Sequence, residues 1–190
     1  MKLVKFYSQI VNWNGDISEF PSLQEKNKWE NNACGIACIR MVINSFLKEG
    51  IKEQSYWSLL QLALNRNAYC EKGWIHKELL EILKAFKLDG RCHRNKTMKD
   101  VVDAIDSGSI CIVSVTKCFS GGKLSEAGFS LPKGGHLVVA YSTCYKKNKI
   151  DSIICNHPSS ADEWNKAGWS VNIEKWINSF SGNFIEVIVD

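Results

Sequence analysis

The sequence lacks several features that would place the protein in a specialised class. No run of apolar residues is long enough to cross a membrane, and residues 1–7 lack the apolar core of a signal peptide. There is no Cys-X-X-Cys pair of the kind that holds structural zinc. The 24 basic residues are nearly balanced by 20 acidic ones, and a net charge of +4 does not suit a dedicated nucleic-acid-binding protein. We therefore expect a cytoplasmic protein that binds neither membrane nor nucleic acid, although a removed secretion leader would leave no trace.

The residues that are present suit one well-packed domain. A chain of 190 residues, 45% of them hydrophobic, is long enough for a single domain over residues 1–190. Most of the eight cysteines fall inside expected helices or strands, so we expect them to be reduced and unlinked. Cys34 and Cys38 lie one helical turn apart in an apolar setting, and arginines flank Cys92 and His93. Neither setting suits a cation, so we expect no metal and no cofactor.

Hydrophobic patterns predict helices in the first half of the chain and strands in the second. Helical spacing is expected at residues 34–48, 56–64, 74–86 and 98–107, with a short helix at 173–180. β-Branched or apolar runs predict strands at residues 3–7, 109–115, 135–145, 149–156 and 184–189. A glycine-rich loop with Gly121, Gly122 and Gly128 separates two of these strands. This order predicts an α+β fold, with a helical part packed on an antiparallel β-sheet.

Cys34 is the candidate nucleophile because it opens an apolar helix. Asn31 and Asn32 precede it and can cap the helix. Unpaired backbone N–H groups and the positive end of the helix dipole both favour thiolate over thiol at this position. Gly35 leaves room for a substrate backbone to approach the sulfur. The alternative is a small buried cysteine on a core helix.

A cysteine nucleophile needs a histidine as its base, and the chain has four. His76 falls in an amphipathic helix, His93 in a basic loop, and His157 at a strand end beside Pro158. His136 follows two glycines and opens an apolar strand, which places it at the mouth of a cleft. We therefore expect His136 to be the base.

The group that orients the base should lie where the next strand ends. In an antiparallel pair the end of one strand lies beside the start of the other, and the next strand ends in Asn156-His157-Pro158. Asn156 could accept a hydrogen bond from one ring nitrogen of His136 and present the other to the sulfur. It could equally be a turn residue that terminates the strand.

Taken in order, these segments resemble papain-like cysteine peptidases, and more narrowly the double-glycine leader peptidases that process bacteriocins and their standalone relatives. The resemblance rests on residues 6–9, 33–42, 134–141 and 155–158 and covers nearly the whole chain. It implies a papain-like fold and a glutamine upstream of the cysteine that donates to the oxyanion. Gln9 fits that glutamine best, and Gln24 is its competitor. The family usually has Asp directly before the proline, where this chain has His157. Either Asn156 takes the role with a one-residue shift, or the orienting group is missing.

Two candidate functions follow from this resemblance. The first is a cysteine peptidase or related thiol hydrolase that acts on a peptide or protein substrate with Cys34, His136, Asn156 and Gln9. A transglutaminase-like or amidase activity is a variant of the same chemistry. The absent aspartate supports the second, a catalytically impaired domain that binds a peptide or protein partner without cleaving it. No feature of the sequence sets the oligomeric state.

Overall fold

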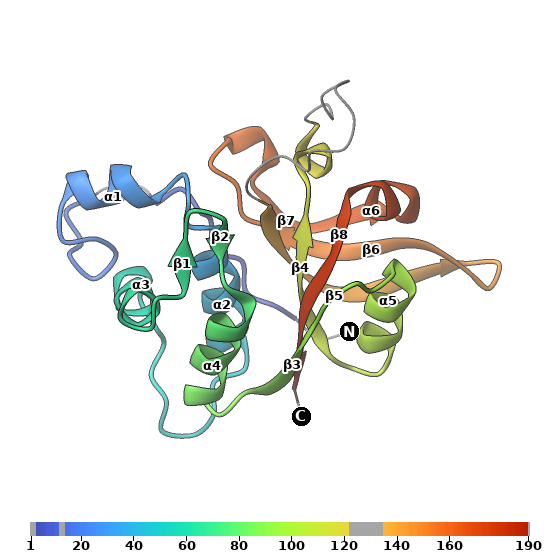
Figure 1. Ribbon diagram of the computed structural model, residues 1–190, viewed down its shortest axis with the longest axis horizontal. Coiled ribbons are helices and arrows are strands. Elements are labelled where there is room, and N and C mark those ends of the chain that lie inside the picture. Colours follow the sequence, from blue (N-terminus) through green and yellow to red (C-terminus); the bar gives the residue numbers. More distant parts are fainter. Residues whose placement is uncertain (1–2, 12–13, 122–134, 190) are drawn as a thin grey trace.

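The computed structural model describes residues 3–11, 14–121 and 135–189. A helical half comes first along the chain and a sheet half follows (Figure 1). The helical half contains α1 (Leu23–Trp29), α2 (Cys34–Ser45), α3 (Tyr56–Asn65), the short strands β1 (Tyr69–Cys70) and β2 (Gly73–Trp74), and α4 (His76–Ala85). The sheet half contains β3 (Asp89–His93), α5 (Met98–Asp106), β4 (Ile110–Val115), the 3-10 turn η1 (Lys117–Ser120), β5 (His136–Lys146), β6 (Lys149–His157), the 3-10 turn η2 (Asp162–Trp164), β7 (Lys166–Asn172), α6 (Ile173–Ser179) and β8 (Phe180–Ile188). Of the expected glycine-rich loop, Gly122 and Gly128 lie outside the described residues.

The sheet half is built on one six-stranded antiparallel sheet with the order β3-β8-β4-β5-β6-β7. Helices cover both faces of it, since α2 and α4 lie on one side and α5 and α6 on the other (Figure 1). Along β4, Ile110 and Ile112 join the core under α2, while Cys111 and Val113 join the core under α5. Burial on both faces explains why residues 110–113 of the strand are an unbroken apolar run. The expected α+β class, with helices packed on an antiparallel sheet, is confirmed.

Helix α2 is the central element of the helical half. Ten of its twelve residues are buried, because α3, α4 and the sheet surround it. The helix ends at Ser45, short of the predicted residue 48. Ser45 donates its hydroxyl to the Met41 carbonyl at 2.5 Å and accepts the backbone N–H of Lys5 at 2.7 Å. This side chain thus ties the end of the helix to the N-terminal segment.

The predicted strand at residues 3–7 is wrong, because this segment joins no sheet. Side chains rather than a neighbouring strand bind this segment. The carbonyls of Val4 and Lys5 accept from the Asn156 amide at 3.1 and 3.2 Å. A local β pattern predicts an extended chain but not whether a partner strand is present.

Other predicted elements are present with small shifts, and five helices and strands were missed. Thr97 caps α5 as predicted, and its backbone N–H donates to the Asp100 carboxylate at 2.9 Å. The β5–β6 turn has positive φ at Lys147 and Asn148, which suits the twist of a tight hairpin. Trp74 belongs to β2 and not to the helix that follows. The helices and strands missed from the sequence are α1, β1, β2, β3 and β7.

Candidate active site

Cys34 is the first residue of α2 and lies at a helix start that no side chain caps. Ala33 is the N-cap residue, and the predicted asparagine cap does not form. Other elements hold this segment through its carbonyls: the Tyr56 hydroxyl donates to Ala33 at 3.0 Å and the Trp74 indole N–H donates to Asn32 at 2.6 Å. The first backbone N–H groups of the helix are therefore available to the sulfur.

The Cys34 thiol is neutral in this arrangement. Burial raises its pKa to about 11, because only 7% of the residue is exposed. The backbone N–H groups of Leu137, Gly35 and Cys34 itself act in the opposite direction. The expected stabilisation of thiolate by the helix start is therefore present, but the cost of burying the charge outweighs it.

Gly35 does not leave an open approach for a substrate, as the sequence suggested. A Cβ at this position would lie 2.5 Å from Cγ of Trp74, so the indole fills the space that glycine provides. Trp74 packs against Tyr69 and Trp29, with ring centroids 4.9 and 6.4 Å away. This aromatic cluster forms a wall beside Cys34, which was missed because its members come from α1 and the β1–β2 hairpin.

His136 begins β5, where it pairs with Val115 of β4. Helix α2 packs on β5, and the backbone N–H of Leu137 donates to the Cys34 sulfur. The thiol therefore lies at the strand end that carries the imidazole. Burial and, to a smaller extent, the neighbouring His157 lower the pKa of His136 to about 3, against the opposing effect of the Pro158 carbonyl. Its Nε2 atom is buried and has no hydrogen-bond partner among the described residues.

Asn156 does not orient His136, which corrects the prediction from the sequence. Its Nδ2 donates to the carbonyls of Val4 and Lys5, and its Oδ1 accepts the backbone N–H of Gly168 at 2.9 Å. The residue is 1% exposed, and these contacts occupy both ends of its amide. Adjacent residues of a strand point to opposite faces of the sheet, so Asn156 faces the N-terminal segment and His157 faces the other way.

His157 is the neighbour of His136 in space. Their ring centroids lie 4.7 Å apart at an angle of 58°. Nδ1 of His157 bonds the Trp164 carbonyl, and its Nε2 lies 3.1 Å from the Ser120 hydroxyl. Burial lowers its pKa, and so do the charges of Lys175 and Lys166, whereas the Trp164 carbonyl raises it. His157 is thus a fully buried histidine at the position directly before Pro158.

Of the two candidate glutamines, Gln9 has the more suitable surroundings. It is 2% exposed, and its Nε2 donates to the Glu30 carbonyl at 2.5 Å, in the segment that leads to Cys34. Its Oε1 is buried without a hydrogen-bond partner among the described residues. Gln24 instead lies exposed in the first turn of α1, not in a loop as predicted. An exposed side chain on that helix is poorly placed to serve as an ordered donor.

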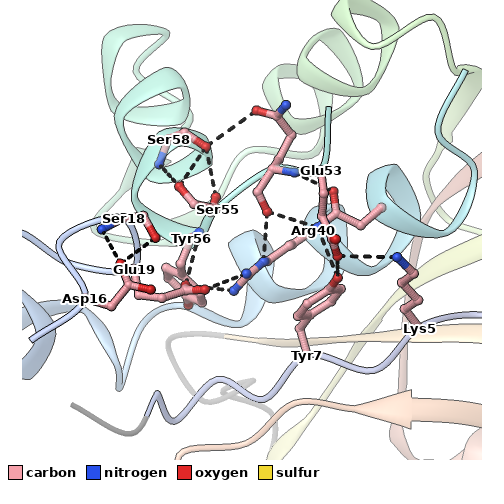
Figure 2. Close-up of polar contacts among 12 residues, drawn as sticks. Lys5, Tyr7, Asp16, Ser18, Glu19, Arg40, Glu53, Ser55, Tyr56 and Ser58 are labelled. Atoms are coloured by element: carbon pink, nitrogen blue, oxygen red, sulfur yellow. Dashed lines mark hydrogen bonds and ion pairs between the residues drawn. The ribbon is translucent and has the colours of Figure 1, made fainter. Parts of the chain in front are cut away.

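A polar network on the outer side of α2 fixes the segments around the site (Figure 2). Arg40 makes a two-point contact with Glu19, at 2.6 and 2.8 Å, and donates to the Gln54 carbonyl at 3.1 Å. Its guanidinium also lies 4.3 Å from the ring centroid of Tyr7, whose hydroxyl bonds Glu53. The network therefore joins the N-terminal segment, the loop before α1 and the start of α3 to one helix. The one charged residue of a mostly apolar helix was the sequence signal for it.

The described ranges contain no helix that is long and apolar enough to cross a membrane. Within the same ranges, no three His, Cys, Asp or Glu side chains are grouped as a metal ion would require.

Comparison with known proteins connects this arrangement to a peptidase fold. The sequence matches no protein-family model and no curated protein. Among solved structures, a double glycine motif protease from an AMS/PCAT transporter, in complex with the leader peptide, gives a TM-score of 0.51 at 14% identity and covers 98% of this chain and 91% of that chain. The peptidase domain of Streptococcus ComA, a bifunctional ABC transporter involved in quorum sensing, gives 0.54 at 15% identity, with coverage of 84% and 93%. A protein of Bacillus anthracis described as a C39-like peptidase gives 0.62 at 13% identity, with coverage of 100% and 96%. The chain therefore has the fold of the double-glycine, C39-like cysteine peptidase domains, as its sequence motifs predicted.

Proposed function

We propose that this protein is a cysteine peptidase in which Cys34 is the nucleophile and His136 is the base. One observation supports this most directly. The backbone of Leu137, the residue that follows His136, lies against the Cys34 sulfur, so the start of α2 and the start of β5 are neighbours. The peptidase fold of the neighbouring structures supports the same assignment.

The reaction begins from a neutral thiol and a neutral imidazole. His136 removes the thiol proton as the sulfur attacks the scissile carbonyl carbon, which gives a tetrahedral intermediate with an oxyanion. His136 then returns the proton to the leaving amine as the C–N bond breaks. Water hydrolyses the resulting thioester by the same proton transfers and releases the free acid and the Cys34 thiol.

The backbone N–H of Cys34 and the amide of Gln9 are the proposed donors to the oxyanion. Gln9 Nε2 has two N–H bonds, and the Glu30 carbonyl takes one, which leaves one for the substrate oxygen. Removal of one such donor typically lowers kcat by about 10²–10³. Gln9→Ala should therefore lower kcat far more than it raises KM, whereas Gln24→Ala should change neither.

The substrate class proposed is a peptide with a pair of small residues before the scissile bond. The neighbour that holds a leader peptide is named for a double-glycine motif, and the Trp74 wall beside Cys34 leaves little space for large side chains. The test is hydrolysis of a peptide library, with and without Gly-Gly, by the native chain, by Cys34→Ser and by the exposed control Cys70→Ser. Cleavage that survives in Cys34→Ser would refute the assignment.

A specific observation favours a second function, peptide binding without cleavage. Nε2 of His136 has no acceptor among the described residues, and Asn156 is engaged elsewhere. Isothermal titration of the same peptides separates the two functions. Binding by the native chain with no product after prolonged incubation would establish the second.

A further inference from the structure

The neighbouring histidines His136 and His157 differ in how many of their ring nitrogens form hydrogen bonds. His157 uses both ring nitrogens, one toward Trp164 and one toward Ser120. Nε2 of His136 is buried without a hydrogen-bond partner among the described residues, although the His157 ring lies 4.7 Å away, centroid to centroid. A buried imidazole nitrogen normally has a hydrogen-bond partner, so the unpaired Nε2 of His136 needs a physical explanation.

The contacts of His157 fix its tautomer. A carbonyl oxygen can only accept, so Nδ1 of His157, which bonds the Trp164 carbonyl, must carry a proton. In the neutral ring Nε2 is then an acceptor, and the Ser120 hydroxyl donates to it at 3.1 Å. No atom of His157 remains to accept a proton from His136. The two rings therefore touch only by packing.

Aromatic rings hold the His157 ring in place. Phe119 and Trp169 lie 5.5 and 5.8 Å from it, centroid to centroid. The Lys175 ammonium lies 5.0 Å from the ring centroids of Trp164 and Trp169 on the same cluster. His157 is fully buried within this group, so its side chain has little freedom to rotate toward His136.

The charges around both histidines are positive or neutral. The charges of Lys175 and Lys166 lower the pKa of His157, and His157 in turn lowers the pKa of His136. The Pro158 carbonyl beside His136 is neutral. Backbone N–H groups lower the pKa of Cys34. The charge of a Cys34 thiolate raises the pKa of three side chains near it: Cys38, Tyr56 and Tyr69. None of these described groups is a carboxylate. Within the described ranges, a charged imidazole at His136 would therefore have no nearby negative side chain except the thiolate itself.

We propose that His157 is a positioning residue that holds His136 by ring packing and withholds a hydrogen-bond acceptor from it, so that Cys34 and His136 rest as a neutral pair. This inference rests on the proposed function, because it assigns a role relative to the base. An acidic side chain at position 157 would have the opposite effect. It would accept from Nε2 of His136, stabilise the imidazolium and thereby favour the thiolate of Cys34.

The test is the pH dependence of Cys34 alkylation by iodoacetamide, in which the thiolate forms an S–C bond and releases iodide. The native chain, His157→Asp and His157→Asn are labelled from pH 5 to pH 10, and Cys34 and Cys70 are quantified separately by peptide mapping. Cys70 is exposed and serves as the reference for reagent reactivity in every sample. The ratio of the two rates removes differences in reagent concentration between samples.

The native Cys34 rate should rise about tenfold per pH unit across this range, because labelling follows the thiolate fraction. His157→Asp should show a plateau near neutral pH and a rate at pH 7 at least about tenfold above native. His157→Asn supplies an acceptor oxygen without charge, so its profile should keep the native slope. A native profile that already has a neutral plateau, or a His157→Asp profile identical to native, would overturn the proposal. A residue with only a structural role would change stability but not the shape of this profile.

A second measurement uses the native chain alone and remains decisive if His157→Asp does not fold. Ring ¹⁵N NMR between pH 5 and pH 8 should show His157 as the neutral tautomer with a proton on Nδ1, and His136 as neutral. An imidazolium at His136 at pH 7 would overturn the proposal. Peptide hydrolysis is recorded in parallel, so that a chain that labels as expected but cleaves nothing disproves the proposed function and not this inference.

Discussion

The substitution Asn156→Asp separates a structural from a catalytic role for this residue. A carboxylate replaces the Nδ2 donor that binds the Val4 and Lys5 carbonyls, and it places an acceptor against two acceptors in a site that is 1% exposed. Each lost hydrogen bond is worth about 1 kcal/mol, and the buried carbonyls left without a donor add to the loss. We expect the free energy of unfolding to fall by about 3 kcal/mol, which lowers the Tm by roughly 6–12 °C for a chain of this size.

The assay is urea denaturation followed by circular dichroism, with Asn178→Asp as the matched control. Asn178 is exposed on α6, so its change to Asp should alter the free energy of unfolding by less than about 0.5 kcal/mol. If Asn156 instead oriented His136, an aspartate would preserve or improve catalysis without a large loss of stability. Asn156→Asp with native stability and higher activity would therefore refute the structural assignment.

Three further predictions concern other contacts. Arg40→Met should lower the free energy of unfolding by about 2–3 kcal/mol, because it leaves the partly buried Glu19 without its ion-pair partner. Arg40→Lys should lower it by about half as much, since the charge remains but the two-point contact is lost. Equal losses for the two variants in urea titrations would contradict this. Gly35→Ala should lower the free energy of unfolding by about 1–3 kcal/mol and shift the tryptophan fluorescence spectrum, because the new methyl group clashes with the Trp74 ring. An unchanged spectrum and stability would show that the ring is not packed there. The pKa of His136 in the folded chain lies below its ordinary value of 6.5. Between pH 6.5 and pH 3 the unfolded chain therefore binds a proton at this residue and the folded chain does not, so the free energy of unfolding falls as the pH is lowered through this range. Between pH 7 and pH 5 this loss should be about 2 kcal/mol, and His136→Gln should remove that part of the pH dependence; identical pH profiles for the two chains would contradict it.

Local patterns in the sequence predicted the elements that their own residues stabilise. The apolar run that begins at Cys34, the capped helix after Thr97 and the β-branched run of β4 each form where they were expected. The fold class followed from their order. The peptidase resemblance followed from short motifs around Cys34 and His136, and the solved structures support it as a fold.

The predictions that failed depended on contacts between distant segments. Residues 3–7 have a strand-like pattern, but whether a strand forms depends on a partner, and here the Asn156 side chain takes that place. Strand β7 was missed because Gly168 interrupts its pattern and because it lies at the sheet edge. The choice between Asn156 and His157 depended on which face of β6 each residue occupies, and register shifts interrupt the pairing of β6 with both of its neighbours. The state of the Cys34 thiol depended on burial by Trp74 and β5, which the helix sequence alone does not contain.

The position of β8 has a consequence for how the protein is made. This strand comes after all the others in the chain, yet it lies between β3 and β4, with Asp89 opposite Ile188. β3 and β4 are complete by residue 115 and β8 begins at residue 180, so the edges of both strands stay open while residues 116–179 are made. Pairing across such sequence separations is slow, and a chain released before β8 would expose the unpaired edges of β3 and β4 to other nascent chains. Premature termination should therefore give aggregates rather than a smaller folded product.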